Sequence, residues 1–158
     1  MTTSGEVEEC VRSEFRRLVG VVAVAAGSTA VAEDAVQLAF VKAFERVERG
    51  RSIDNLPAWV VRVAINETRS RWRRVAAERW ALAKLNGHAE ASENTDELLD
   101  LGEAIRILPA RQQQTVVLHY LMGLDVATTA TILGVGAGTV KKALSRARDR
   151  LGEALEER

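Results

Sequence analysis

Proline occurs at only two of the 158 positions, Pro57 and Pro109, so long stretches of the chain contain nothing that forbids a helix. Alanine, leucine, arginine and glutamate are frequent and are good helix formers. The aromatic fraction is 4%, so any core must consist mainly of aliphatic side chains and must be modest in size. The sequence therefore predicts an all-α fold.

Two helix-rich blocks, residues 6–82 and 95–158, flank a short segment, residues 83–94. The stretch NGHAEASENT within and just after this segment is small and polar and has no apolar stripe to bury. We therefore expect two small helical domains joined by a flexible acidic linker. In the first block the pattern predicts helices over residues 7–26, 29–49 and 56–82, with Asn55 as the N-cap of the third and Pro57 in its first turn.

The second block is predicted to contain four helices. The first follows a capping-box spacing, Asn94 to Glu97, and ends before Pro109, which opens the second helix, through Met122. Asp125 is positioned to cap a short third helix ending at Leu133. The turn at residues 134–136 then leads into a last helix that runs nearly to the end of the chain.

Charge is unevenly distributed although the formal net charge is zero. Residues 62–79 carry six arginines against two glutamates, and residues 137–150 carry five basic residues against one aspartate, so each segment has a net charge of +4. Residues 84–103 carry a net charge of −5 and offset most of that surplus. Two separate basic patches indicate a nucleic-acid partner, while the alternative for either one is a solvated helix face.

The second basic patch lies in a helix-turn-helix pattern. Ala130, Gly134 and Val140 have the required spacing: a small residue where two helices cross, a glycine for the tight turn, and an apolar anchor. Val140 also begins an apolar stripe that continues through Leu144, Ala147, Leu151 and Leu155. The polar faces of this helix can then reach phosphates and base edges in a major groove. A helical hairpin with a hydrated basic face remains the alternative.

The first basic patch has its own helical repeat. Arg62, Asn66, Arg69 and Arg73 recur at intervals of four, three and four, which places them on one face of a helix. An asparagine among arginines suits contact with a base.

Several other functions find no support. Cys10 has no partner for a disulfide, and with His88 and His119 it is too little for a zinc site. No nucleophile–base set and no phosphate-binding glycine loop after a strand is visible, so we expect neither an enzyme nor a cofactor. The start lacks the order of a signal peptide and no apolar run is long enough to span a bilayer, so we expect a cytoplasmic protein without membrane insertion.

Four segments in order carry a resemblance to a known family: AEDAVQLAFVKAFERV, LPAWVVRVAINETRSRWRR, ILPARQQQTVVLHYLMGL and the helix-turn-helix. Together they resemble the successive regions of RNA polymerase sigma factors of the extracytoplasmic-function (ECF) group. By that resemblance the first block is region 2, which binds the polymerase clamp and opens the promoter. The second block is region 4, which reads the upstream promoter element.

The resemblance implies roles for particular residues. Those implied to bind core polymerase are Glu33, Asp34 and Gln37. Those implied to melt the promoter and hold the non-template strand are Arg51, Ser52, Asp54, Asn55, Trp59, Arg62, Asn66, Arg69 and Arg73. Those implied to bind the upstream element are Thr139, Lys141, Lys142, Ser145, Arg146 and Arg148. Solvation near a helix start is the alternative for Glu33 and Asp34, and packing is the more frequent role of a tryptophan such as Trp59.

The chain also departs from the family pattern. Leu38 stands where an acidic residue is usual, Ser70 where an aspartate is usual, and Gly136 where a serine is usual. The partners implied are core RNA polymerase, promoter DNA and an anti-sigma factor, with no small-molecule substrate. A second hypothesis, motivated by Leu38 and Ser70, is a sigma-like decoy that binds an anti-sigma factor without supporting transcription. A free helix-turn-helix repressor would leave the first block unexplained.

Overall fold

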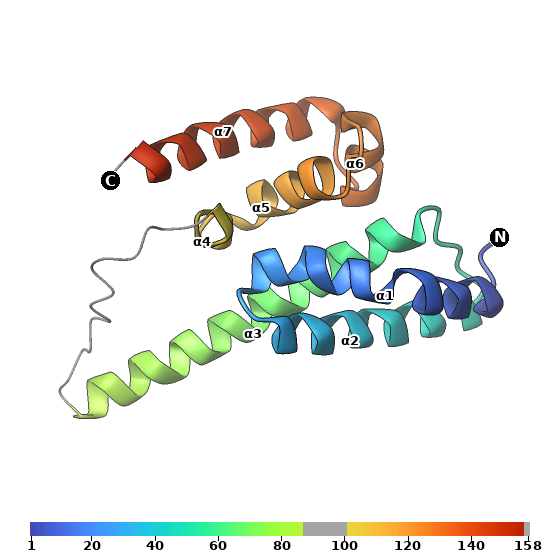
Figure 1. The fold of residues 1–158 in the computed structure, drawn as a ribbon, viewed down its shortest axis with the longest axis horizontal. Coiled ribbons are helices and arrows are strands. Elements are labelled where there is room, and N and C mark those ends of the chain that lie inside the picture. Colours follow the sequence, from blue (N-terminus) through green and yellow to red (C-terminus); the bar gives the residue numbers. More distant parts are fainter. Residues whose placement is uncertain (87–100, 157–158) are drawn as a thin grey trace.

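The computed structural model describes residues 1–86 and 101–156, and every regular element within these ranges is a helix. The first block contains α1 (Ser4–Ala26), α2 (Thr29–Glu48) and α3 (Leu56–Asn86), which pack against one another. The 31-residue α3 continues well beyond the ends of α1 and α2 (Figure 1). The all-α prediction is confirmed for the described residues.

Caps explain where the helices of the first block begin. Thr3 forms a capping box with Glu6, in which each side chain accepts a hydrogen bond from the other residue's backbone N–H, at 3.2 and 2.6 Å. This box moves the start of α1 three residues upstream of the predicted Val7. The Asn55 side chain accepts from Ala58 N at 3.2 Å, which confirms Asn55 as the N-cap of α3. At its other end α3 runs four residues past the predicted Leu82.

The second block contains α4 (Leu101–Arg106), α5 (Ala110–Val116), η1 (Val117–Leu121), α6 (Val126–Leu133) and α7 (Ala137–Glu156). Pro109 precedes α5 as predicted, and Asp125 caps α6 by accepting from Thr128 N at 2.7 Å. The capping box predicted at Asn94 to Glu97, and most of the segment predicted as a linker, lie outside the described residues.

The element η1 is a π-helical turn where the sequence predicted continuous α-helix. Met122 N donates to Val117 O at 3.0 Å, which closes the wider turn. Leu124 N then bonds Leu118 O at 3.1 Å, and the His119 ring nitrogen Nδ1 bonds Leu124 O at 2.7 Å. These bonds join the end of η1 to the loop that leads into α6.

The buried apolar side chains form one cluster that extends through both blocks. Its largest fully buried members include Leu18 and Ile65 in the first block and Ile105 and Leu118 in the second. Helix α4 packs against α1, while α5, η1 and α6 contact α3. In Figure 1 the second block accordingly lies along one side of the three-helix bundle.

Candidate nucleic-acid interface

The turn between α6 and α7 has the geometry of a helix-turn-helix. Gly134 lies in the left-handed region with φ 68°, Ala130 is buried, and Val140 is fully buried between the helices. The apolar stripe of α7 is buried at Val140, Leu144 and Ala147. It ends sooner than predicted, because Leu155 is 45% exposed. The bonded turn and the buried anchor confirm the predicted motif.

The six residues of α7 that the resemblance assigned to the upstream element are all exposed: Thr139, Lys141, Lys142, Ser145, Arg146 and Arg148. Within the part of the chain that the structure describes, Arg148 forms a side-chain hydrogen bond: its Nη1 donates to the Tyr120 hydroxyl at 2.9 Å. Tyr120 belongs to η1 and was not among the predicted site residues. The π-helical turn that carries it has no signature in the apolar spacing, so the sequence offered no signal for this contact.

A second candidate surface is a hollow of about 440 Å³ beside α2, α3 and the loop that joins them. Three of the predicted residues line it: Arg51, Trp59 and Asn66. Lys42, Arg46 and Arg49 of α2 and its C-cap also line it and were missed by the sequence, although their repeat at intervals of four and three was visible. Glu45, Glu67 and Val63 complete the wall, with Lys42 and Glu67 forming an ion pair at 2.6 Å.

The loop before α3 is fixed from both sides. Ile53 is buried, while Arg51, Ser52 and Asp54 are exposed. Thr2 bonds the loop through its hydroxyl, which donates to Ile53 O at 2.7 Å and accepts from Ile53 N at 3.0 Å. Arg46 Nε also donates to Ser52 O at 3.4 Å. Asp54 does not line the hollow. The side-chain oxygen of Asn55 accepts the hydrogen bond that caps α3.

The arginine-rich face of α3 is only partly free. Arg62, Asn66 and Arg69 are each hydrogen-bonded to the second block, whereas Arg73 is exposed and lines a different cavity with Arg69. Burial lowers the pKa of the Arg69 guanidinium below its usual value, and the neighbouring charge of Arg73 lowers it further. Arg69 nevertheless keeps its charge at neutral pH, because the ordinary pKa of arginine is so high.

The residues assigned to polymerase docking share one exposed side of α2. Glu33, Asp34 and Gln37 are all exposed, and so is Leu38, at 41%. Asp34 pairs with Arg71 of α3 at 3.4 Å. Both side chains of that pair are more than half exposed, so the pair contributes little to stability and leaves Asp34 available to a partner.

Among residues 1–86 and 101–156, no cluster of three or more His, Cys, Asp or Glu side chains is placed to hold a metal ion. Within the same ranges no helix combines the length and apolarity needed to cross a bilayer.

The described residues form an all-helical protein whose second block contains a helix-turn-helix, a motif typical of DNA-binding proteins. Residues 10–78 match the family described as Sigma-70 region 2, and residues 98–151 match Sigma-70, region 4. The chain belongs to the sigma-70 family of RNA polymerase sigma factors, which are transcription initiation factors, and within it to the ECF group.

Known sigma factors are similar to this chain in sequence over nearly its whole length. The RNA polymerase sigma-E factor of Streptomyces antibioticus is 31% identical over 97% of this chain and 86% of its own length. The ECF RNA polymerase sigma factor SigM of Mycobacterium tuberculosis is 29% identical over 94% of this chain and 76% of its own. Among solved structures, the sigma factor RpoE of Bartonella quintana, in complex with the anti-sigma factor NepR, is similar with a TM-score of 0.66. It is 26% identical, over 94% of this chain and 96% of that one.

Proposed function

We propose that this sigma factor directs bacterial RNA polymerase to promoters by dividing the work between its two blocks. The observation that carries the proposal is the hollow that gathers Arg51, Trp59 and Asn66 beside three further cations of α2 and its C-cap. An aromatic face, an amide and four cations, which outnumber the two glutamates of the wall, suit a base displaced from a duplex together with its phosphates. The first block would hold the separated non-template strand there.

The second block would read the upstream element through α7. Lys141 and Lys142 lie in the first turns of the helix, nearest the turn after Gly134, and are the candidates for base edges. Arg146 and Arg148 lie farther along the helix, where contacts to the phosphate backbone are expected. Thr139 and Ser145 add hydroxyls on the exposed part of the helix.

Catalysis would belong to the polymerase alone, to which α2 docks through Glu33, Asp34 and Gln37. Their exposure on one side of a helix suits charge pairing with arginines of a partner. The chain itself would bring no chemistry and no cofactor. Its place of action would be the cytoplasm, where polymerase and promoter DNA meet.

An anti-sigma factor is the third proposed partner. The structure of RpoE from Bartonella quintana was solved with such a factor bound, and it is similar to this chain over nearly its full length. We infer that this chain also binds a protein of that kind, which would hold it inactive.

The direct test is run-off transcription with purified chain, core polymerase and the DNA upstream of the chain's own gene. We expect a discrete transcript that depends on added chain. Lys141→Ala with Lys142→Ala should abolish the transcript, whereas Glu153→Ala, an exposed change at the far end of the same helix, should not. Absence of any transcript while the chain still binds core polymerase would reject the proposal.

The decoy hypothesis remains a second candidate because of one observation on the docking side of α2. Leu38 is 41% exposed there, where the family usually has an acidic residue that could pair with the polymerase. Ser70, also exposed, replaces the usual aspartate of the melting helix. A decoy would bind an anti-sigma factor and fail in the transcription assay, and Leu38→Asp together with Ser70→Asp should restore the transcript if these two positions are the cause.

A further inference from the structure

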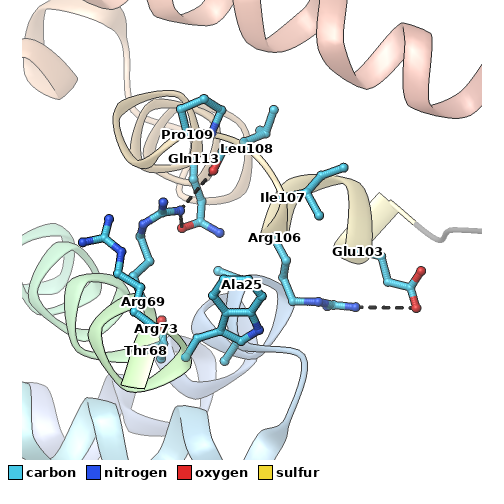
Figure 2. Close-up of a pocket in the computed structure, with 12 residues that line it drawn as sticks. Ala25, Thr68, Arg69, Arg73, Glu103, Arg106, Ile107, Leu108, Pro109 and Gln113 are labelled. Atoms are coloured by element: carbon cyan, nitrogen blue, oxygen red, sulfur yellow. Dashed lines mark hydrogen bonds and ion pairs between the residues drawn. The ribbon is translucent and has the colours of Figure 1, made fainter. Parts of the chain in front are cut away.

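The loop at residues 50–55 carries part of the surface that we propose for the separated strand. Arg69 of α3, another part of that surface, is bonded to the second block: its Nη1 donates to Leu108 O at 3.0 Å and to Gln113 Oε1 at 2.9 Å (Figure 2). Among the described residues, the side-chain bonds that hold the loop come from the first block instead. The groups that fix the shape of this loop therefore decide how it would meet a base.

The first half of the loop is fastened to the end of α2. Gly50 N donates to Val47 O at 2.9 Å, and Arg51 N donates to Arg46 O at 3.1 Å. Gly50 lies in the left-handed region with φ 78°, which lets the chain turn away directly after the helix. The Arg46 side chain extends this hold by one residue, through its bond to Ser52 O.

Ile53, in the second half of the loop, depends on the N-terminal segment. The residue is 6% exposed, and within the described ranges neither its N–H nor its C=O bonds another backbone group. Both groups bond the Thr2 hydroxyl, which accepts from Ile53 N at 3.0 Å and donates to Ile53 O at 2.7 Å. Buried backbone groups require partners, because an unpaired one loses its hydration without compensation. One side chain thus satisfies the loop where the contacts of α2 end.

The Thr2 hydroxyl uses all of its hydrogen-bonding capacity at this loop. A hydroxyl has one hydrogen and two lone pairs, and Ile53 takes the hydrogen and one lone pair. Ser52 Oγ lies 3.2 Å from Thr2 Oγ1, so the Ser52 hydroxyl is the donor of the third bond. Ser52 Oγ in turn accepts from Thr2 N at 3.3 Å. The hydrogen of the Ser52 hydroxyl is therefore engaged within the protein.

The start of α1 keeps Thr2 beside the loop. Thr3 is the N-cap of that helix and forms the capping box with Glu6, so the residue directly before it has a fixed direction. Thr2 is partly buried, and it does not line the hollow that gathers the candidate base-binding residues. It would therefore act on a bound base only through Ser52 and Ile53.

We propose that Thr2 is a positioning residue for promoter recognition: its hydroxyl sets the conformation of the loop at residues 50–55 and thereby which base the loop accepts. The inference rests on the proposed function, because it takes this loop to contact the displaced base. A site discriminates between bases only if its polar groups are held in the productive geometry. Attraction to phosphates carries no sequence information and does not depend on that geometry in the same way. Loss of the Thr2 hydroxyl should therefore reduce base selectivity more than overall affinity.

Two substitutions at Thr2 separate the hydroxyl from the rest of the side chain. Thr2→Val keeps nearly the same shape and removes the three hydroxyl bonds. Thr2→Ser keeps the hydroxyl and loses only the methyl group. The matched control is Thr131→Val, the same change on α6, where an exposed hydroxyl donates to Ala127 O at 3.1 Å within its own helix.

The first measurement is amide hydrogen exchange at Ile53, followed by nuclear magnetic resonance in the free full chain. We expect Thr2→Val to speed this exchange on the order of tenfold, because the N–H loses its acceptor. Thr2→Ser and Thr131→Val should exchange like the wild type. Unchanged exchange in Thr2→Val would show that the loop does not depend on Thr2 and would overturn the inference.

The second measurement is base selectivity of the holoenzyme on a promoter fragment whose non-template strand is single-stranded over the melted segment. Each base of that segment is changed singly, and the ratio of the affinities for the original and the changed base is recorded. We expect Thr2→Val to lower this ratio by about three- to tenfold at one position or at two adjacent positions. The salt dependence should stay unchanged, because no charge is lost. Thr2→Ser should restore the wild-type ratio.

The outcomes separate this inference from the proposed function. Wild-type ratios in Thr2→Val would overturn the positioning role, and so would a uniform loss of affinity with unchanged ratios. Trp59→Ala tests the proposed function by itself, since Trp59 lines the hollow directly. If Trp59→Ala weakens strand binding while Thr2→Val changes nothing, the proposed function stands and the role of Thr2 falls. If Trp59→Ala binds the strand as the wild type does, the hollow does not hold the strand, and both proposals fall.

Discussion

Arg148 forms a side-chain hydrogen bond that its expected role did not include. The sequence placed it as a free cation on α7, but its guanidinium donates to the Tyr120 hydroxyl of η1 at 2.9 Å. That bond restricts a long side chain that would otherwise sample many rotamers. Tyr120 therefore orients the guanidinium that we propose as a phosphate contact.

We expect Tyr120→Phe to weaken binding of holoenzyme to every upstream element by about two- to fivefold, because the Arg148 side chain loses its acceptor. The dependence of binding on salt should stay unchanged, since no charge is removed. Arg148→Ala should instead lower the salt slope by about one. Binding measured across a salt series distinguishes the two variants. A change of the salt slope in Tyr120→Phe would contradict the proposal that Tyr120 positions Arg148.

Lys141 and Lys142 test whether α7 reads sequence. Replacing one of them by alanine should relax preference at particular base pairs, by about 1 to 3 kcal/mol for a good base contact. Holoenzyme binding to matched and single-mismatch upstream elements measures the effect. If both variants weaken all elements by the same factor, α7 is an electrostatic contact and sequence reading lies elsewhere, in the loop at residues 50–55.

At the scale of elements, α6 depends on one exposed cap. Asp125 accepts from Thr128 N, and these hydrogen bonds lower the pKa of its carboxyl below the ordinary value. A carboxyl whose folded pKa is depressed stabilises the fold above its unfolded pKa, and that contribution is lost as pH falls through the folded pKa. The helix-turn-helix should therefore be less stable in acid.

We expect Asp125→Ala to lower the melting temperature of the second block at neutral pH and to flatten its dependence on acid pH. Asp125→Asn is the matched control, because asparagine also caps helices but carries no charge. It should retain most of the neutral-pH stability and share the flattened acid response. Thermal melting followed by circular dichroism between neutral and strongly acid pH measures the melting temperature and its dependence on pH. Identical pH profiles in the wild type and the two variants would exclude Asp125 as the source of the acid sensitivity.

Elements were predictable where their signals are local. Asn55, Pro109, Asp125 and Gly134 each specify a helix boundary through their own side chain or backbone freedom, and the structure places boundaries at all four. The π-helical turn at Val117–Leu121 was not predictable, because an apolar run is compatible with either kind of turn. The contact of Tyr120 with Arg148 depends on this turn, so it was not predictable from the sequence either.

The candidate site was less predictable than the fold because its contacts join distant parts of the chain. Arg62 and Ile132 lie 70 residues apart, and Arg106 and Val24 lie 82 residues apart. Such pairs leave no periodicity in either segment. The same holds for Thr2, which fixes the loop around Ile53 from 51 residues away.

At the scale of the whole molecule, the residues that we propose for docking on polymerase lie on a side of the first block that the second block leaves exposed. Asp34, Glu33 and Gln37 are exposed on α2, and the Asp34–Arg71 pair is too solvated to compete strongly with a partner. Docking on the polymerase could therefore occur without breaking the hydrogen bonds between α3 and the second block. Docking and DNA binding would then be separable by mutation.

We expect Asp34→Arg to weaken binding to core polymerase by at least about tenfold, because a repulsive charge replaces an acceptor for the partner's arginines. Gln37→Ala should have a smaller effect, from the loss of neutral hydrogen bonds. Glu48→Arg is the matched control, as it makes the same charge change at an exposed position at the far end of the same helix. A competition assay with labelled chain measures the affinities, and circular dichroism confirms that the helices persist. If the double variant at Asp34 and Gln37 bound core polymerase as tightly as the Glu48 control, α2 would not be the docking helix, and the search would turn to the exposed side of α1 around Arg12 and Arg16.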